Sequence, residues 1–348
     1  MTSLVIQTAF LGDVVLTTPL LRALAQSDGP LDVVTTPAAA PLLETHPAVR
    51  RVIPYAKRGP DRGWRGLGRL ARQLRAEGYA TAYLPHRSLR SAAVAWLARV
   101  PRRVGFHDGW RLLYTETRRR PAEGHEVDRL LALAGPPTPP APPTPPHPAP
   151  GRYQMPDLET TIPDRTRAEG FLREHHLREP FAALAPGSIW GSKRWPAFPQ
   201  LAERLAPRVG IVVVGGAEDA SLAAEVTTAV ARAGGRAASA CGRLSLRESV
   251  EIIRRACVLV TNDSAPLHFA QAVGTPTVAL FGPTVPAFGF GPRGPRDRAL
   301  GVVGLPCRPC SPHGPPACPL GHHRCMTELS LEQLLAAIEE TGALHRRG

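Results

Sequence analysis

Residues 241–284 read CGRLSLRESVEIIRRACVLVTNDSAPLHFAQAVGTPTVALFGPT. This stretch contains a helix-like segment at 246–256, an apolar strand-like run at 257–263, a second helix from residue 264 and a second strand-like run at 275–283. Short apolar strands that alternate with helices of this length are typical of a parallel, doubly wound sheet. The stretch therefore predicts a fold of the α/β class.

The same alternation continues on both sides of this stretch. In the second half, further strands are expected at 181–188, 211–216 and 236–242, with helices near 197–207, 217–233 and 330–342. In the first half, a helix is expected at 14–26 and strands are expected at 3–9, 31–36, 49–55, 81–86 and 102–106. We therefore predict two Rossmann-like, doubly wound domains.

A proline-rich segment separates the two halves. Residues 136–150 contain ten prolines in fifteen positions, and proline has no backbone N–H to donate to a helix or a sheet. We expect an N-terminal domain at 1–135, a stiff connector at 136–150 and a C-terminal domain at 151–348. Two such domains that face a central cleft would bind ligands at the carboxyl ends of their strands, which suits a transfer between two substrates.

Length and charge narrow the class of protein. The 348 residues suffice for two domains, no apolar run reaches the roughly 18 residues of a membrane span, and no signal peptide is recognised, so we expect a soluble, cytoplasmic protein. Residues 1–150 carry 20 basic against 11 acidic side chains, which favours an anionic partner. Alternatively, arginine is only the solubilising residue of a chain with 40 Arg, two Lys and one Asn.

A turn after the first strand carries a candidate catalytic carboxylate. Gly12 and Asp13 follow strand 3–9 and precede a helix, at the strand edge where open α/β sheets bind ligands. Asp13 can satisfy free amides at the helix N-terminus. It can also act as a general base that removes a proton from an attacking hydroxyl. The residues alone leave both roles open.

A loop of the second half, PGSIWGSKRWP at 186–196, offers a candidate anion site. Backbone amides near Gly187 and Ser188, with the cations Lys193 and Arg194, could bind a diphosphate and neutralise its charge as it leaves. A solvated basic loop is the alternative. The scarcity of lysine in this chain favours a specific role for Lys193.

Two more loops leave strands at the same edge. After strand 257–263, Asp263 could accept hydroxyls of a sugar, the amides from Ser264 onward could meet phosphate, and His268 follows on the next helix. Helix capping is the rival role for Asp263 and Ser264, and a buried structural role is the rival for His268. The second loop, residues 281–284, ends at Thr284.

These motifs resemble those of glycosyltransferase family 9, which includes the ADP-heptose:lipopolysaccharide heptosyltransferases. The shared elements cover nearly the whole chain: LGDVVLTTPLLRAL at 11–24, PGSIWGSKRWP at 186–196, VVVGGAED at 212–219, residues 241–284 and a cysteine-rich tail, which is similar to that of heptosyltransferase II. The resemblance implies a GT-B architecture and an inverting, metal-independent transfer of heptose that requires no cofactor. ADP-heptose would be the donor and the lipopolysaccharide inner core the acceptor.

The resemblance also implies roles for individual residues. Asp13 would activate the acceptor hydroxyl, Lys193 would stabilise the departing diphosphate, and Glu218 would bind the nucleotide ribose. The donor contacts it implies are Gly187, Ser188, Lys193, Arg194, Glu218, Asp263, Ser264, Ala265, His268 and Thr284. The family usually has glycine at the position of Ala265, and alanine would narrow the approach to phosphate if that position required a positive φ.

An anionic, lipid-linked oligosaccharide acceptor fits the basic first half. Gly12, Arg87 and Arg90 are the candidates for acceptor binding, with Arg102 and Arg103, because arginine binds carboxylates and phosphates in bidentate fashion. A solvated face is the alternative for each arginine. The segment RGWRGLGRLARQLR at 62–75 could rest on an anionic bilayer as a basic amphipathic helix, which would place the protein at the inner face of the inner membrane.

Four cysteines lie close together near the C-terminus, at Cys307, Cys310, Cys318 and Cys325. Their spacing is compatible with a structural zinc site, although no catalytic metal is expected. Reduced thiols and disulfides are the alternatives, and a cytosolic setting disfavours disulfides. The remaining two cysteines, at positions 241 and 257, are expected to be small buried residues.

Three other functions fit part of the pattern. A transferase of the same fold could use another nucleotide sugar and another glycan acceptor. A nucleic-acid-binding protein is suggested by the sequence pI of 10.4, but aromatic residues make up only 5% of the chain and no nucleic-acid module is recognised, so no nucleic-acid partner is expected. A dinucleotide-dependent dehydrogenase is disfavoured because strand 3–9 lacks a following G-x-G-x-x-G.

Overall fold

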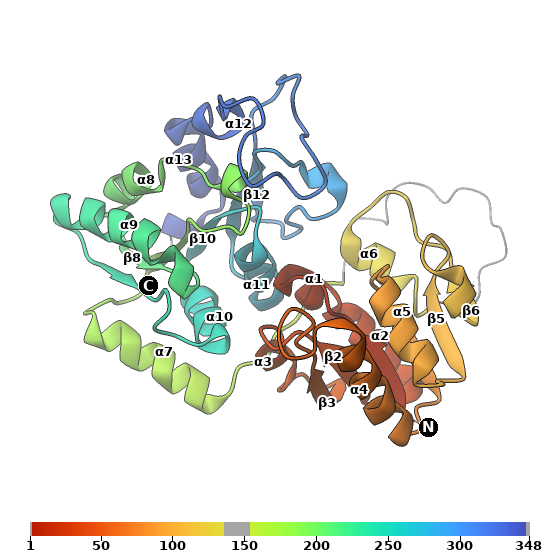
Figure 1. Ribbon diagram of the computed structural model, residues 1–348. Coiled ribbons are helices and arrows are strands. Elements are labelled where there is room, and N and C mark those ends of the chain that lie inside the picture. The colour runs from red at the N-terminus through yellow and green to blue at the C-terminus, as the bar shows by residue number, and fades with distance from the viewer. Residues whose placement is uncertain (1, 136–153, 346–348) are drawn as a thin grey trace. The chain divides into compact units, whose positions relative to one another are not determined.

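The computed structural model describes residues 2–135 and 154–345 (Figure 1). The chain divides into two compact units, Met1–Glu159 and Thr160–Gly348, and each is described by itself. The predicted connector at 136–150 lies outside the described residues.

The first unit contains a six-stranded parallel sheet with the order β3-β2-β1-β4-β5-β6. Its strands are β1 (Ser3–Ile6), β2 (Leu31–Thr35), β3 (Val49–Pro54), β4 (Thr81–Leu84), β5 (Arg102–Phe106) and β6 (Glu116–Arg118). Its helices are α1 (Leu11–Leu16), α2 (Thr18–Asp28), α3 (Ala40–Leu43), α4 (Gly63–Ala76), α5 (Leu89–Leu97), η1 (Arg111–Leu113) and α6 (Glu126–Leu131). The strand order reverses direction between β1 and β4, which is the switch point where doubly wound sheets bind ligands.

The second unit repeats this topology, with the order β12-β11-β10-β7-β8-β9. Its strands are β7 (Phe181–Ala185), β8 (Gly210–Val213), β9 (Ala237–Ser239), β10 (Val258–Asn262), β11 (Thr277–Leu280) and β12 (Arg298–Leu300). Its α-helices are α7 (Ile162–Glu174), α8 (Phe198–Leu205), α9 (Ala220–Arg232), α10 (Leu246–Arg255), α11 (Ala265–Val273), α12 (Arg324–Thr327) and α13 (Leu331–Glu340), and its 3-10 turns are η2 (Gly191–Lys193), η3 (Ala217–Asp219), η4 (Pro286–Phe288) and η5 (Ala343–His345). The switch point lies between β7 and β10.

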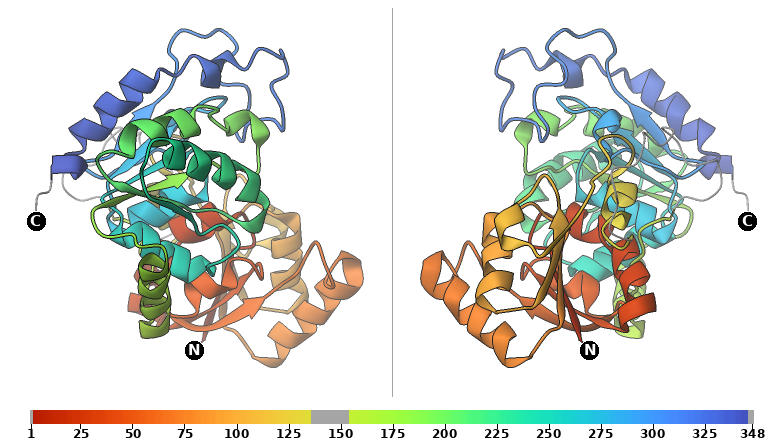
Figure 2. Two further views of the ribbon diagram at one scale, coloured as in Figure 1. Left: turned by 90° about the vertical axis from the view of Figure 1, so that its left-hand side faces the viewer. Right: turned by 90° about the vertical axis from the view of Figure 1, so that its right-hand side faces the viewer.

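The prediction of two doubly wound α/β sheets is confirmed. All the predicted strands form. Strands β1, β2, β4, β7, β10 and β11 are fully buried in sheets that helices cover (Figure 2), whereas β3 and β9 are only partly buried. The sequence analysis missed the edge strands β6 and β12 and the helix α7. Both edge strands have three residues, and each includes an arginine or a glutamate that is only partly buried.

Helix α4 forms where the basic amphipathic helix was predicted, but its apolar face is not free. Leu67, Leu70 and Leu74 are buried together with residues of α5 and of the sheet. The apolar residues of this helix belong to the core and cannot enter a bilayer, so only contact through its exposed residues stays a prediction. Trp64 and the arginines of α4 remain exposed. In the described ranges, no helix has both the length and the apolar character needed to cross a membrane.

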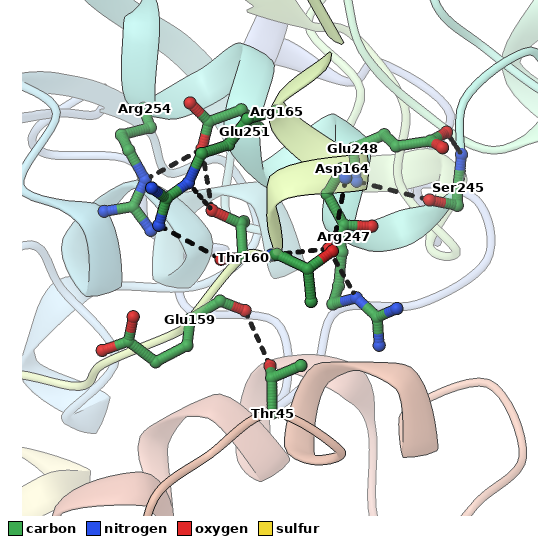
Figure 3. A network of polar contacts seen from close by, with 11 residues as sticks. Thr45, Glu159, Thr160, Asp164, Arg165, Ser245, Arg247, Glu248, Glu251 and Arg254 are labelled. Atoms are coloured by element: carbon green, nitrogen blue, oxygen red, sulfur yellow. Dashed lines mark hydrogen bonds and ion pairs between the residues drawn. The ribbon is translucent and has the colours of Figure 1, made fainter. Parts of the chain in front are cut away.

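Polar contacts hold α7 against α10 in the second unit (Figure 3). The Thr160 hydroxyl donates to Glu251 Oε2 at 2.9 Å, and Arg254 Nε donates to the same oxygen at 3.1 Å. Arg247 Nε donates to Asp164 Oδ2 at 3.0 Å. These contacts join α7 and the residues before it to α10.

Candidate active site

The chain's only asparagine ties together two loops at the switch point of the second unit. Asn262 ends β10 and is fully buried. Its Nδ2 donates to the Pro186 carbonyl at 2.8 Å, and its Oδ1 accepts the Trp195 N–H at 3.1 Å. Because a side-chain amide both donates and accepts, Asn262 fixes both ends of the loop that follows β7.

A buried ion pair lies between these loops. Lys193 Nζ lies 2.6 Å from Asp263 Oδ2 and 3.2 Å from the Asp263 carbonyl oxygen. The Thr284 hydroxyl donates to the same Oδ2 at 2.6 Å. All three residues are buried, so Lys193 does not belong to a solvated loop. Over the residues that the structure describes, Asp263 Oδ1 accepts no hydrogen bond, which leaves it available to a sugar hydroxyl.

Helix α11 begins beside this pair. Ser264 occupies its N-cap position, but its hydroxyl makes no capping bond and instead lies 3.4 Å from the Asn262 carbonyl. Ala265 is the first helical residue and does not have a positive φ, so alanine fits here without backbone strain. Pro266 has no N–H and the Leu267 N–H donates to the Ser264 carbonyl at 3.1 Å, so the N–H groups of Ser264 and Ala265 are the ones that can meet an anion here.

His268 lies one turn further along α11 and is buried. Its Nδ1 lies 3.0 Å from Gln271 Oε1. Burial lowers the pKa of His268, the Gln271 contact and the Asp263 charge raise it, and the Lys193 charge lowers it. The imidazole is therefore neutral at pH 7 and suited to hydrogen bonding.

The loop after β8 contains an acidic residue, Asp219, that the sequence analysis missed. It lies against the loop after β7: a Cβ at Gly187 would lie 2.3 Å from the Asp219 carboxylate, so a larger residue at position 187 would displace this side chain. Asp219 is buried and accepts the Gly216 N–H at 3.1 Å, while Glu218 is exposed. Burial raises the pKa of Asp219. Asp219 could have been predicted as a site residue from its position in the sequence, in the loop that follows β8.

Arg194 and Ser188 hold the first half of this loop in shape. Arg194 donates through Nε and Nη2 to the Ser188 carbonyl, at 3.0 and 2.8 Å. The Ser188 hydroxyl accepts the Trp190 N–H at 3.2 Å. Both residues therefore have structural partners at the edge where the sequence placed a diphosphate, and their contact with a donor stays a prediction.

Asp13 lies at the switch point of the first unit, in the first turn of α1 after the buried Gly12. Its Oδ2 accepts the Phe10 N–H at 3.1 Å. Burial raises the pKa of Asp13 to about 6, the Phe10 bond lowers it, and the charge of Glu126 raises it further. One carboxylate oxygen thus serves the helix end, and the raised pKa suits the other to accept a proton.

Further ionisable side chains gather near Asp13. The charges of Lys57 and Arg120 act on its carboxylate, and Lys57 donates to the Thr8 carbonyl. Burial lowers the pKa of Lys57 and of His86. Lys57, His86 and Arg120 each follow a strand at its carboxyl end, so the strand pattern could have placed them together.

The predicted acceptor arginines divide into two groups. Arg87 and Arg90 follow β4 at the carboxyl edge, where Arg87 pairs with Asp108 at 2.9 Å and Arg90 Nη1 lies 3.4 Å from the Tyr55 hydroxyl. Arg102 and Arg103 begin β5 and therefore lie at the opposite edge of the sheet from Asp13. Arg102 and Arg103 were wrong as acceptor candidates, whereas Arg87 and Arg90 stay predictions.

The cysteines are free thiols in this structure. Cys307 Sγ lies 4.0 Å from His322 Nε2, and Cys318 Sγ accepts the His323 N–H at 3.4 Å. Burial raises the pKa of Cys325 to about 11. Within the described ranges no three Cys, His, Asp or Glu side chains are grouped as a metal site. The role of the four tail cysteines stays as open as the sequence left it.

Two doubly wound units, a half-buried carboxylate with a raised pKa and a buried Lys–Asp pair, each at a switch point, suit a group-transfer enzyme. The chain belongs to glycosyltransferase family 9 (heptosyltransferase), whose model matches residues 67–317. This confirms the family and the enzyme class that the sequence motifs predicted.

Several characterised proteins are similar to this chain. Lipooligosaccharide heptosyltransferase 2 of Haemophilus influenzae is 28% identical over 306 residues, which cover 83% of this chain and 85% of that protein. The structure of ADP-heptose lps heptosyltransferase II of E. coli is similar with a TM-score of 0.77 and 25% identity, covering 99% and 98% of the two chains. A glycosyl transferase family 9 structure from Veillonella parvula, with a TM-score of 0.83, 23% identity and coverage of 99% and 98%, shows the same fold.

Proposed function

We propose that this protein transfers heptose from ADP-heptose to the lipopolysaccharide inner core. The observation that carries the proposal is the buried Lys193–Asp263–Thr284 cluster beside the Ser264 and Ala265 N–H groups at the start of α11. An ammonium and helix amides stabilise a diphosphate, and a carboxylate oxygen without a partner binds a sugar hydroxyl. The names of the relatives, heptosyltransferases that act in lipopolysaccharide or lipooligosaccharide synthesis, support the choice of sugar and acceptor.

The proposed reaction is a single displacement. Asp13 takes the proton from an acceptor hydroxyl, whose oxygen forms a bond to the anomeric carbon of the heptose. The bond from that carbon to the diphosphate oxygen breaks, and ADP leaves with the electron pair. Attack opposite to the leaving group inverts the anomeric configuration. Lys193 and the α11 amides supply positive charge for the leaving diphosphate, so the proposal requires no catalytic metal and no cofactor.

The acceptor in this proposal is anchored in a membrane and carries anionic groups. We infer that the protein works at the cytoplasmic face of the inner membrane and engages the acceptor through the basic first unit. The contact does not require the apolar face of α4, which the core occupies. Gly12, Arg87 and Arg90 are the proposed acceptor-binding residues, because they lie after β1 and β4 on the same sheet edge as Asp13.

Calorimetric titration with ADP, UDP and GDP tests the donor assignment. We expect selective binding of ADP and a loss of about 10–100-fold in affinity in Lys193→Ala, the effect of removing a charged hydrogen bond to phosphate. Arg204→Gln, which removes an exposed ion pair with Glu332, is the matched control and should bind as the wild type does. Preference for UDP or GDP would keep the fold and discard ADP-heptose as the donor.

A further inference from the structure

The cysteine-rich segment, residues 305–326, contacts two of the three loops at the carboxyl edge of the second sheet. It is the loop that follows β12 and leads into α12, coloured blue in Figures 1 and 2. This segment has no role in the proposed reaction. Its contacts around Lys193 and Thr284 indicate that it positions these two residues.

Arg308 fixes the loop that carries Thr284. Its guanidinium donates to four backbone carbonyls, at 2.6 Å to Gly282, 2.6 Å to Val302, 2.8 Å to Phe281 and 3.0 Å to Thr284. Across the described ranges Arg308 makes no ion pair, so its guanidinium N–H groups serve to hold the backbone of this loop. Guanidinium is the side-chain group with enough donors in one plane for this task.

The surrounding residues make room for this contact. A Cβ at Gly301 would lie 2.3 Å from Arg308 Nη2, so a side chain there would displace the guanidinium. The Cys310 N–H donates to the Pro283 carbonyl at 2.8 Å. The segment therefore holds the backbone of residues 281–284 through the Arg308 side chain and the Cys310 N–H.

The same segment holds the turn that carries Lys193. His323 Nε2 donates to the Ser192 carbonyl at 2.7 Å, and the Ser192 hydroxyl donates to the Pro315 carbonyl. Gly314 packs on the Lys193 side chain, because a Cβ there would lie 3.2 Å from Lys193 Cε. Gly314 also has a φ of 78°, which favours glycine.

Both contacts lead to one carboxylate oxygen. Lys193 and Thr284 bond the same Oδ2 of Asp263. Thr284 is attached to the cysteine-rich segment through its own carbonyl, and Lys193 through its neighbour Ser192. We propose that residues 305–326 are a brace that positions Lys193 and Thr284 on Asp263, with Arg308 and His323 as its positioning residues. This proposal depends on the proposed function in one respect: the ligand that Lys193 is positioned to bind is the diphosphate of the donor.

The chain offers a ligand-free test because Lys57 and Lys193 are its only two lysines. The rate of acetylation of each lysine by an amine-reactive ester at pH 8 is measured by peptide mass spectrometry. We expect Arg308→Gln and His323→Leu to raise the rate at Lys193 at least tenfold and to leave the rate at Lys57 unchanged. His323→Gln should restore protection, because its Nε2 can still donate to the Ser192 carbonyl, and glutamine and leucine are equally disfavoured at the positive φ of residue 323. Arg204→Gln should change neither rate.

The brace is refuted if Lys193 stays as protected as in the wild type in folded Arg308→Gln and His323→Leu proteins. Should Arg308→Gln not fold, the comparison of His323→Leu with His323→Gln decides the question alone. Titration with ADP and with adenosine, which lacks the diphosphate, then separates the two proposals. The variants Arg308→Gln and His323→Leu should bind ADP at least tenfold more weakly and should bind adenosine with little change. If the wild type does not bind ADP, the donor assignment is contradicted, but the labelling result for Lys193 still holds.

Discussion

Asp13 shows how one residue can serve structure and chemistry together. Its Oδ2 accepts the amide at the start of α1, as a capping residue would, yet burial raises its pKa to about 6. A general base works best when its pKa lies near the working pH. Capping and catalysis, which the sequence offered as alternatives, are therefore compatible at this position.

The raised pKa predicts a pH profile. Asp13 acts as a base only when it is ionised, so kcat/KM for the acceptor should fall about tenfold per unit as the pH drops below 6. Initial rates between pH 4.5 and 8 measure this. An acceptor without phosphate groups serves as the control, because phosphate titrates in the same range. A rate that is flat down to pH 5 would contradict this role for Asp13.

The same pKa predicts an effect on stability. Because the folded state holds the Asp13 proton more tightly than the unfolded chain, stability should rise as the pH falls from 6 toward 4, and the ionised carboxylate costs stability at pH 7. Asp13→Asn should therefore slow turnover by about 10²–10⁴-fold yet stabilise the first unit by about 1–2 kcal/mol at pH 7.5. Thermal unfolding at pH 7.5 and at pH 4 measures the gain, which should vanish at the lower pH. If Asp13→Asn is less stable than the wild type at pH 7.5, the ionised Asp13 carboxylate does not cost stability, and the raised pKa is contradicted.

At the scale of elements, the site is built by loops that buried side chains tie together. Asn262 connects the end of β10 to Pro186 and Trp195, at the two ends of the loop after β7. This gives a physical reason for the single asparagine of the chain, since no aliphatic or acidic side chain both donates and accepts in that place.

Asn262→Asp tests this connection. Aspartate keeps the acceptor for the Trp195 N–H but loses the donor to Pro186 and buries a charge, so we expect a loss of about 2–4 kcal/mol in the unfolding free energy of the second unit. Urea unfolding followed by tryptophan fluorescence measures it. Ser264→Ala, whose hydroxyl makes only long contacts of 3.4 Å, is the control and should lose less than about 1 kcal/mol. Equal losses in the two variants would contradict the role of Asn262.

The elements also show where sequence reasoning works. Buried strands such as β7 and β10 are continuous apolar runs, and their order along the chain predicts which loops share an edge. Lys193 and Asp263 could be placed on that edge from strand positions alone. Arg308 and His323 could not, because their partners are carbonyls of distant loops and leave no pattern in the sequence. Helix α7 was missed although Thr161 and Asp164 form a capping box at its start.

At the scale of the whole molecule, charge is unevenly distributed. Residues 1–150 account for most of the net charge of +13, while the donor loops belong to the second unit. A basic surface attracts an anionic acceptor over distances that salt screens. We therefore expect the uneven charge to affect the binding of the acceptor more than the binding of the donor.

Salt dependence tests this view. Raising NaCl from 50 to 300 mM should increase KM for a phosphorylated inner-core acceptor about three- to tenfold, because the attraction is long-range. An acceptor freed of phosphate should show a much smaller change, and kcat should stay the same for both. Equal salt dependence of the two acceptors would show that the charge of the first unit does not select the substrate.

The most direct test of the central claim is a product assay with ADP-heptose and a heptose-deficient inner-core acceptor, in which mass spectrometry detects transfer and NMR reads the anomeric configuration. We predict one added heptose with inverted configuration and no product from UDP- or GDP-sugars. The rate should be lower by about 10²–10⁴-fold in Asp13→Asn and by a comparable factor in Lys193→Ala. Retention of configuration, transfer from another nucleotide sugar, or full activity of Asp13→Asn would contradict it.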